Sequence, residues 1–499
     1  MKTGRENASS MRFDRSARAM TLALIVSLAA VAASSSERET PGDVALSREL
    51  DRLFRSSAVS RATVSLEVVD VDTGRVVSER DSHHPILPAS NMKVFTTAAA
   101  LELLTPDYQF RTTLSILGEV ERGVLHGDVR VVGGGDPTIG ERFHDGNALE
   151  VIEEWIIALK KEGIQTIDGN LVFEYGYFDD EWVHPTWPED QLVRWYQAPV
   201  SALSIHEGCV TVRVIPGSAG GAATVEMIPP NDFIKIENST VTSRRGNGVF
   251  VARYLRENTI VVKGSIAPGS GPFDTLVPVV YPVHYFANVT RRAWSEGGIR
   301  VLGRTLVAAR DRRQGWKTIA EQSTPLAVVA MVVNKRSQNH YAEQILKTIG
   351  AETSGEGSWE AGARATTRWM IDTVGVSADE FSQADGSGLS RSNRTSANAF
   401  TRLLRHMWKS QHRWDFLSSM PFNGDRDSRL RRKLNREPYA RRIYAKTGYL
   451  NGVVGLSGYV RAGSGRTYAF SFLVNGYTRG TAAVYAWQDL VLQEIIRNG

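Results

Sequence analysis

A serine and a lysine stand three residues apart at the start of PASNMKVFTTAAALELL, residues 88–104. The apolar residues that follow predict a helix, and on a helix residues three apart share a face, with Cβ atoms about 5–6 Å apart. Lys93 can then accept the proton of the Ser90 hydroxyl, if burial or a nearby positive charge lowers the pKa of the amine. This is the only S-x-x-K in the chain. Taken alone, Ser90 could equally be a helix cap.

A second motif with a lysine, KTG at residues 446–448, lies in the predicted strand YAKTGYL near the C-terminus. Lys446 would add a positive charge that binds a carboxylate and helps to lower the pKa of Lys93. Thr447 and Gly448 are expected to line the substrate site, where the glycine allows a substrate backbone to approach closely. The amide of Tyr449 is expected to face a developing oxyanion.

Two S-x-N matches offer a hydroxyl and an amide to complete this group. The first, SQN at residues 337–339, follows the apolar run LAVVAMVV and precedes a predicted helix, so we expect it on a loop between two packed helices. The second, SAN at residues 396–398, opens another predicted helix and is interpreted as its cap. We therefore choose Ser337 to relay a proton and Asn339 to hold a peptide carbonyl.

The elements that must position these groups come from both ends of the chain. A chain of 499 residues is too long for one core, so two or more domains are expected. Hairpin strands and amphipathic helices near both termini predict one α/β domain, residues 40–108 plus 284–499. Between them, short strands broken by Gly, Asn and Pro predict an inserted, mostly β module at residues 109–283, long enough for two subdomains.

The N-terminus has the pattern of a secretory signal, residues 1–33, in which basic residues precede the apolar run TLALIVSLAAVAA. The run is too short to span a bilayer comfortably, so we expect removal after export, with an uncleaved anchor as the alternative. This segment accounts for three of the chain's five net positive charges. The small positive charge of the remaining residues does not indicate binding to nucleic acid. The basic run at residues 426–442 is interpreted as a solvated face, with a polyanion site as the alternative.

The cysteine and histidine content gives no sign of a metal or another cofactor. Cys209 is the only cysteine, which excludes an internal disulfide and a cysteine-based metal site. The only close histidine pair, His83-His84, is expected on a surface loop, and H-E-x-x-H does not occur. A metallopeptidase is therefore disfavoured.

S-x-x-K, S-x-N and K-T-G in this order are the signature of penicillin-binding proteins and class A β-lactamases. The 244 residues from Lys93 to Ser337 exceed what a compact β-lactamase domain can hold. The sequence resembles the D-alanyl-D-alanine carboxypeptidase/endopeptidase family of low-molecular-mass class C penicillin-binding proteins, which carry a large insertion at this point. Further stretches support the resemblance: LPASNMKV, GGGDPTIG, IDGNLVF, W-P-x-x-D at 187–190, QAPVSAL, and DGSGLSR at 385–391.

The resemblance implies a penicillin-binding/serine β-lactamase-like transpeptidase fold, an antiparallel sheet flanked by helices. It implies a serine D-Ala-D-Ala carboxypeptidase or endopeptidase that cleaves peptidoglycan stem peptides through an acyl-enzyme on Ser90 and is acylated by β-lactams. Asp190 and Arg391 would recognise the free end of a diaminopimelate side chain, with a helix cap and a structural ion pair as the alternatives. The location implied is the periplasm or the outer face of the cytoplasmic membrane, with at most peripheral membrane association.

Three positions depart from the family pattern. Gln338 stands where Asp is frequent, which we interpret as of little consequence. Tyr449 replaces a small hydroxyl residue and is expected to narrow the side-chain preference. MPFNGDRDSRLRR, residues 420–432, replaces an apolar-G-x-D-G stretch and has no interpretation from the sequence.

Two rival functions remain open from the sequence. A β-lactamase would need a water-activating carboxylate, and the E-x-x-L-N stretch that supplies it in class A enzymes is absent. A noncatalytic cell-wall-binding protein is disfavoured because the serine, lysine and asparagine residues of all three motifs are intact.

Overall fold

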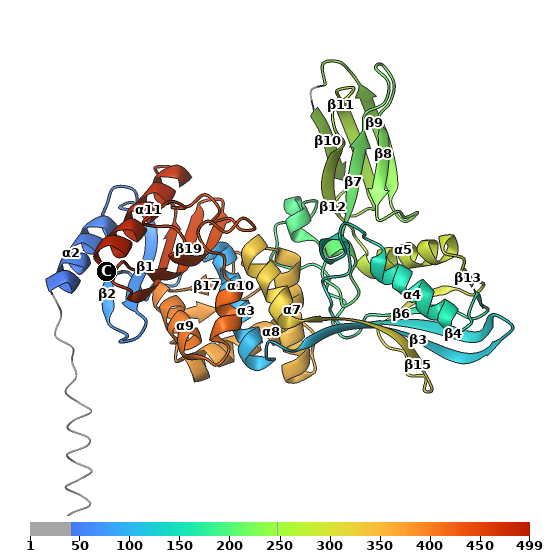
Figure 1. The fold of residues 1–499 in the computed structure, drawn as a ribbon, viewed down its shortest axis with the longest axis horizontal. Helices are drawn as coiled ribbons and strands as arrows, with labels where there is room; N and C mark the ends of the chain where they lie inside the picture. Colours follow the sequence, from blue (N-terminus) through green and yellow to red (C-terminus); the bar gives the residue numbers. More distant parts are fainter. Residues whose placement is uncertain (1–40, 247) are drawn as a thin grey trace, which may run out of the picture. The chain divides into compact units, whose positions relative to one another are not determined.

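The computed structural model describes residues 41–246 and 248–499 (Figure 1). The predicted signal segment, residues 1–33, lies outside the described residues. By its contacts the chain divides into Met1–Ala45 and Leu46–Gly499, and the architecture below belongs to the second unit. Among the described residues, none of the helices combines the length and the apolar character needed to cross a membrane.

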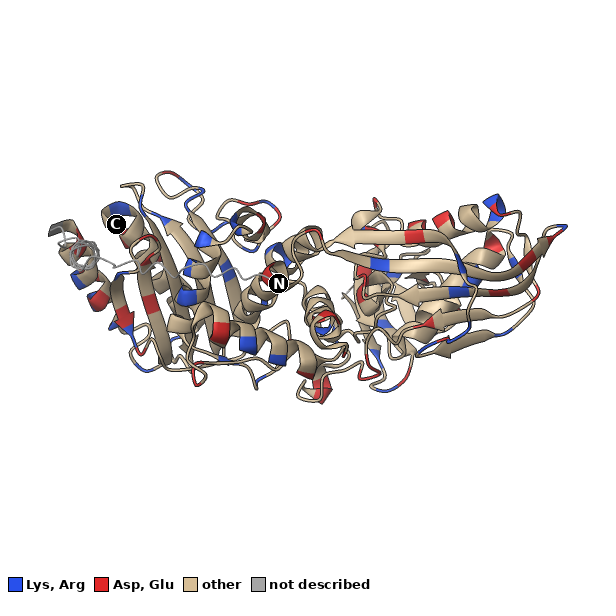
Figure 2. Ribbon diagram, turned by 90° about the horizontal axis from the view of Figure 1, so that it is seen from below, with Lys and Arg blue, Asp and Glu red and all other residues tan. Residues whose placement is uncertain are grey.

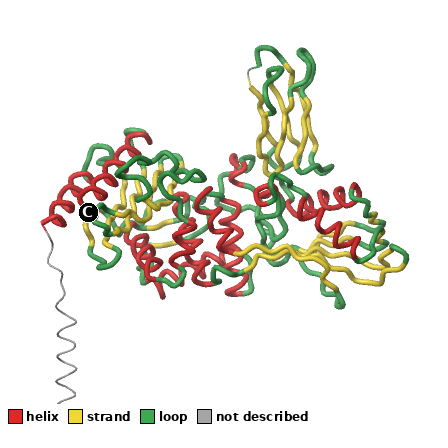
Figure 3. The backbone as a smooth tube through the Cα atoms, viewed as in Figure 1, coloured by secondary structure: helices red, strands yellow, loops and turns green. Residues whose placement is uncertain are grey.

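Five strands from the two ends of the chain form one antiparallel sheet in the order β18-β19-β20-β1-β2 (Figures 1 and 3). At its centre β1 (Thr63–Asp70) pairs along its whole length with β20 (Thr467–Asn475). The flanking strands are β2 (Val76–Arg80), β19 (Val453–Arg461) and β18 (Ile443–Leu450). β18 is an edge strand and carries the KTG motif. The free edge of this motif therefore lies next to the segments that pack beside the sheet.

Helices cover both faces of this sheet, which explains why the central strands are buried on both sides. On one face the second unit's part of α2 (Pro41–Phe54) and α11 (Thr481–Asn498) enclose a core in which Phe54 and Trp487 pack against Phe472. On the other face lie α3 (Met92–Leu103), α7 (Asn339–Ser354) and α9 (Ala397–Lys409). α3 is buried from Met92 to Leu101, as its apolar sequence requires.

A seven-stranded sheet dominates the inserted module. Its strands are β3 (Gln109–Glu121), β4 (Val124–Gly133), β5 (Thr166–Ile167), β6 (Leu171–Glu174), β13 (Arg300–Val301), β14 (Thr305–Ala308) and β15 (Lys317–Pro325). The helices α4 (Glu150–Lys161) and α5 (Pro282–Glu296) share its core. The boundary predicted at residue 283 is therefore too early. Because Pro325 pairs with Gln109, the chain leaves and returns at adjacent points, and the insertion spans residues 109–325.

Two three-stranded sheets complete the insertion. One contains β7 (Cys209–Ile215), β8 (Thr224–Ile228) and β12 (Phe273–Pro278), and the other β9 (Lys235–Thr242), β10 (Gly248–Arg253) and β11 (Thr259–Ile266). Their buried residues join those of the seven-stranded sheet in one continuous core. Apart from short 3₁₀ helices, the remaining helices and strands are α6 (Leu326–Met331), the π-helices η6 (Val332–Arg336) and η7 (Met370–Val374), α8 (Trp359–Trp369), β16 (Phe381–Ser382), β17 (Arg394–Thr395) and α10 (Arg413–Ser419). Acidic and basic residues are interspersed over these elements (Figure 2).

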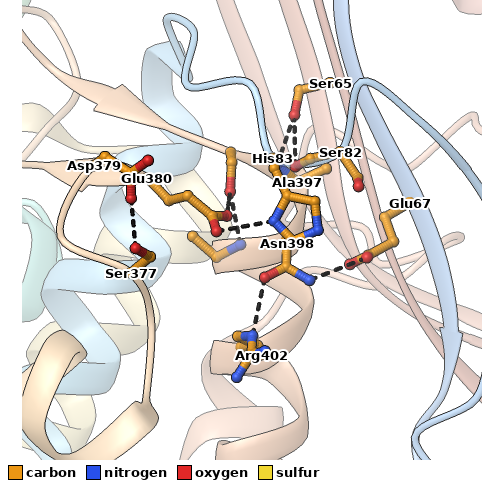
Figure 4. Close-up of polar contacts among 12 residues, drawn as sticks. Ser65, Glu67, Ser82, His83, Ser377, Asp379, Glu380, Ala397, Asn398 and Arg402 are labelled. Atoms are coloured by element: carbon orange, nitrogen blue, oxygen red, sulfur yellow. Dashed lines mark hydrogen bonds and ion pairs between the residues drawn. The ribbon is translucent and has the colours of Figure 1, made fainter.

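A buried polar network joins β1 to the beginning of α9 (Figure 4). The Ser65 hydroxyl oxygen accepts a hydrogen bond from the backbone N–H of Ala397 at 2.8 Å. Ser396 caps α9, because its Oγ accepts from the N–H of Ala399 at 2.9 Å while its hydroxyl donates to the buried Glu380 carboxylate. The interpretation of the second S-x-N match as a helix cap is thus confirmed.

We expect Ser396→Ala to lower the free energy of unfolding by about 1–2 kcal/mol, because the substitution removes the cap and leaves Glu380 without this donor. Urea unfolding followed by tryptophan fluorescence measures the change. Ser377→Ala removes an exposed hydroxyl that bonds Asp379 and is the control. Equal stability of the two variants would contradict the assignment of Ser396 as a structural cap.

Candidate active site

The serine and the lysine of S-x-x-K lie side by side at the beginning of α3. Ser90 belongs to a short 3₁₀ turn, η1 (Ala89–Asn91), and Lys93 to the first turn of α3. Lys93 Nζ is 3.2 Å from Ser90 Oγ. Asn91, not Ser90, occupies the cap position of α3, so the hydroxyl is not used as a cap. Ser90 is partly exposed at a cleft, whereas Lys93 is fully buried.

Lys93 Nζ also contacts two other acceptors. It donates to Asn339 Oδ1 at 2.6 Å and to the Ser387 carbonyl oxygen at 2.7 Å. Burial lowers the pKa of Lys93 to about 7, although the carboxylates of Glu343 and Asp385 oppose the shift. The amine is therefore neutral in a substantial fraction of molecules near neutral pH, as a proton acceptor for Ser90 must be.

Glu343 in α7 is a buried carboxylate that holds the 385–388 loop against Lys93. Its Oε2 accepts hydrogen bonds from Trp359 Nε1 (2.9 Å) and Gly386 N (2.7 Å), and its Oε1 accepts from Ser387 N (2.9 Å). Burial raises the pKa of Glu343, and the nearby charge of Asp385 raises it further. Sequence reasoning missed this residue. The available signal was a glutamate four positions after Asn339, on the same face of a helix that is otherwise buried.

Ser337 and Lys446 form the second pair of the site. Ser337 connects η6 to α7 in the left-handed conformation, with φ 59° and ψ 38°. Lys446 Nζ donates to Ser337 Oγ at 2.8 Å and to the Thr447 carbonyl oxygen at 2.7 Å. The pKa of Lys446 is lowered by burial and by the positive charges of Lys93 and Arg429. All five residues predicted as catalytic, Ser90, Lys93, Ser337, Asn339 and Lys446, thus meet in one place.

Two glycines allow backbone segments to pack directly on the turn that carries Ser90. A Cβ atom on Gly448 of β18 would lie 2.6 Å from the Pro88 carbonyl oxygen. A Cβ atom on Gly388, where φ is +82°, would lie 1.9 Å from the Ala89 carbonyl oxygen. The KTG strand and the DGSG loop therefore hold the turn from two sides, which fixes the position of the serine hydroxyl.

Ser90, Ser337 and Asn339 line a cleft of about 890 Å³, and the buried Lys93 and Lys446 contact these residues from behind it. Of the predicted substrate-binding residues, Thr447, Gly448, Tyr449 and Arg391 line it, and Arg391 Nη2 donates to the Asn451 carbonyl oxygen at 3.0 Å. Asp190 is exposed in η3 (Glu189–Gln191) and is not among the lining residues, although Pro188 and Gln191 on either side of it are.

Gln338 is more than a variable position in this structure, which corrects our interpretation from the sequence. Its side chain is buried, and its Nε2 donates to the carboxylate of Glu207. Glu207 belongs to the inserted module and also accepts from Arg142 Nε at 2.6 Å. The central residue of S-x-N is thereby bonded to the insertion, a contact between distant segments that no local sequence pattern signals.

Metal ligands do not gather in the described part of the chain, where no group of three or more His, Cys, Asp or Glu side chains could hold an ion. His83 and His84 are exposed, and His83 Nδ1 lies 2.9 Å from Glu380 Oε1. Cys209 is buried with a free thiol.

Comparison with known proteins gives consistent results over nearly the whole chain. The profile of the D-Ala-D-Ala carboxypeptidase 3 (S13) family matches residues 46–492. A D-alanyl-D-alanine carboxypeptidase of Actinomadura sp. (strain R39) is 31% identical over 452 residues, which cover 87% of this chain and 81% of that protein. The D-alanyl-D-alanine carboxypeptidase DacB of Haemophilus influenzae is 25% identical over 420 residues, 82% of this chain and 85% of the relative.

Solved structures show the same fold, including the insertion. The crystal structure of penicillin binding protein 4 (dacB) from Haemophilus influenzae superposes with a TM-score of 0.76 at 22% identity, covering 89% of this chain and 99% of that one. The predatory endopeptidase Bd0816 of Bdellovibrio bacteriovorus gives a TM-score of 0.50 at 16% identity, over 87% and 93% of the two chains. The chain therefore belongs to the D-Ala-D-Ala carboxypeptidase 3 (S13) family and is a serine carboxypeptidase, which confirms the resemblance found in the sequence.

Proposed function

We propose that Ser90 is the nucleophile and Lys93 the general base in hydrolysis of D-Ala-D-Ala ends of peptidoglycan stem peptides. The observation that carries this assignment is the 3.2 Å contact between Ser90 Oγ and a fully buried Lys93 Nζ at the edge of the cleft. Neutral Lys93 takes the hydroxyl proton as Oγ bonds to the carbonyl carbon of the penultimate D-alanine. The scissile C–N bond then breaks, and water later hydrolyses the acyl-enzyme.

In this proposal Ser337 and Lys446 serve the leaving group. The leaving nitrogen must gain a proton, and Ser337 Oγ, which accepts a hydrogen bond from Lys446 Nζ at 2.8 Å, is the hydroxyl that relays one to it. Protonated Lys446 binds the carboxylate of the terminal residue, and the negative charge of that carboxylate favours the protonated form of the amine. Asn339 Nδ2 donates to the Tyr196 carbonyl oxygen at 2.8 Å, and its second hydrogen can hold the peptide carbonyl of the substrate.

The remaining contacts set the geometry and the substrate class. Thr447 and Gly448 face the substrate backbone, and the amide of Tyr449 stabilises the oxyanion. Arg391 and Asp190 recognise the carboxylate and the ammonium of a diaminopimelate side chain, since their charges are complementary to these groups. β-Lactams acylate Ser90; a solved structure of the Haemophilus influenzae protein is described as complexed with a β-lactam.

Export follows from this substrate, because peptidoglycan lies outside the cytoplasmic membrane. The basic and apolar pattern of residues 1–33 supports delivery by a cleaved signal. We place the mature enzyme in the periplasm or at the outer face of the cytoplasmic membrane.

Ser90→Ala should lower D-alanine release from a pentapeptide muropeptide by more than about 1,000-fold and abolish covalent labelling by fluorescent penicillin. The reason is that no other hydroxyl contacts Lys93 Nζ among the described residues. Intact-mass spectrometry and product analysis measure both effects. Ser396→Ala is the control and should still be labelled at the native rate. Labelling of Ser90→Ala, or sustained nitrocefin turnover by the native enzyme, would contradict the proposal.

The rate of acylation by benzylpenicillin should rise as the pH increases from about 6 to 8. Burial lowers the pKa of Lys93 to about 7, so the amine is protonated and unable to accept a proton below that pH and is neutral above it. Stopped-flow acylation measures the profile, since benzylpenicillin keeps its charge over this range. A rate that is flat or falls across this interval would exclude Lys93 as the base.

A further inference from the structure

The cleft extends beyond the reacting groups to a wall that the sequence alone did not explain. This wall is formed by part of the segment 420–436, which begins with the residues that replace the family's apolar-G-x-D-G stretch, together with one face of α11. Its lining residues are Arg429, Leu430, Arg432, Lys433, Tyr485, Gln488 and Asp489.

The acidic residues of this segment are all engaged on the side of the S-x-N loop. Asp425 lies 3.6 Å from Lys335, and Asp427 lies 3.0 Å from Arg336. The charge of Lys433 is matched by Asp489 of α11. The other two cations of the segment that line the cleft are Arg429 and Arg432. None of these three acidic residues forms an ion pair with either of them.

Arg429 and Arg432 are exposed, and within residues 41–246 and 248–499 their side chains have no ion pair or hydrogen bond. Arg429 is close enough to Lys446 for its charge to act on that amine. Arg429 therefore lies on the side of the cleft nearest Lys446, and Arg432, three residues further along the segment, also lines the cleft.

We propose that Arg429 and Arg432 form a subsite for the carboxylates of the leaving peptide, so that the enzyme favours cross-linked stem peptides over single ones. This proposal rests on the function proposed above. A terminal D-alanine offers one carboxylate, which Lys446 binds. A cross-linked substrate places a second stem peptide there, with further carboxylates that two guanidinium groups can bind.

The double variant Arg429→Ala/Arg432→Ala tests this subsite. Its kcat/KM for a cross-linked muropeptide dimer should fall about 10-fold, equivalent to about 1.4 kcal/mol, while that for a monomeric pentapeptide changes less than about 3-fold. The control is Arg431→Ala/Arg436→Ala, which removes the same charge from exposed positions of this segment that do not line the cleft.

Equal losses for dimer and monomer, or no loss for the dimer, would overturn the subsite. Penicillin labelling of Ser90 separates this result from failure of the proposed function, because labelling depends on the reacting groups and not on the dimer's second peptide. A native enzyme that penicillin does not label would instead refute the catalytic assignment.

A second, independent observation concerns the contact between the insertion and the S-x-N loop. Gln338 is flanked by Ser337 and Asn339, and its amide is anchored by Glu207, which Arg142 holds in turn at 2.6 Å. His206 and Glu207 both have positive φ, 53° and 60°. Such backbone is unfavourable for residues other than glycine and persists only where the surroundings impose it.

We infer that Glu207 is a positioning residue for the reaction. By fixing the side chain of Gln338, it holds the short link in which Ser337 adopts its left-handed conformation. The Ser337 hydroxyl then stays within reach of Lys446, and the Asn339 amide stays within reach of Lys93.

Reversing the polarity of this hydrogen bond tests the inference. Gln338→Asp sets a carboxylate against Glu207, and we expect acylation by benzylpenicillin to slow about 10-fold through the rate constant for bond formation, with little change in the binding constant. Adding Glu207→Gln should restore most of the rate, because the new amide can donate to the new carboxylate.

Thermal unfolding of each variant distinguishes positioning from a structural role. Restored acylation in the double variant supports the inference. The inference would be overturned by a native rate in Gln338→Asp, by a double variant as slow as the single one, or by rates that follow stability alone.

Discussion

The site depends on keeping the amine of Lys93 away from water while leaving Ser90 within reach of it. A lysine in solvent is protonated at neutral pH and cannot accept a proton. Burial disfavours the protonated amine and lowers its pKa, and the carboxylates of Glu343 and Asp385 partly offset this shift. The result is an amine whose two protonation states are both accessible under physiological conditions. Much of the surrounding architecture serves this balance, from the apolar body of α3 to the loop that carries Ser387.

The same requirement explains why the catalytic groups come from separate segments. A wall that excludes water from one nitrogen must close around it from several directions, and a single helix cannot do this. Here α3 supplies Lys93, α7 supplies Asn339 and Glu343, and the 385–388 loop supplies a carbonyl oxygen. β18 brings Lys446 to Ser337. Because the glycines at 388 and 448 let backbone pack directly on the serine turn, small displacements of any of these segments would be felt at the nucleophile.

The insertion contributes to the site as well as enlarging the molecule. Its residues reach the S-x-N region at two points, through the Tyr196 carbonyl oxygen on Asn339 and through Glu207 on Gln338. Another part of the cleft is lined by the segment around Arg429 and by α11. In the function that we propose, reaction chemistry and substrate choice therefore use different parts of the chain: the first relies on buried groups where the three motifs meet, and the second on exposed groups that line the cleft.

The sequence by itself determined the motifs, their order and the family they imply. Ser90, Lys93, Ser337, Asn339 and Lys446 were identifiable because local spacing and flanking hydrophobic pattern limit what each can do. The same reasoning separated Ser396, a helix cap, from Ser337. It did not find Glu343, the link from Gln338 to Glu207, or the true end of the insertion at residue 325. It interpreted the basic run 426–442, which contains Arg429, as a solvated face and did not place it at the cleft.

Those features were decided by tertiary structure, since they arise from contacts between residues far apart in the chain. The pairing of Pro325 with Gln109 sets the boundary of the insertion, and no local period reveals that pairing. Likewise, the pKa of Lys93 depends on how completely three segments, distant in the sequence, exclude water from its amine. The spacing of residues along the chain does not reveal this degree of burial.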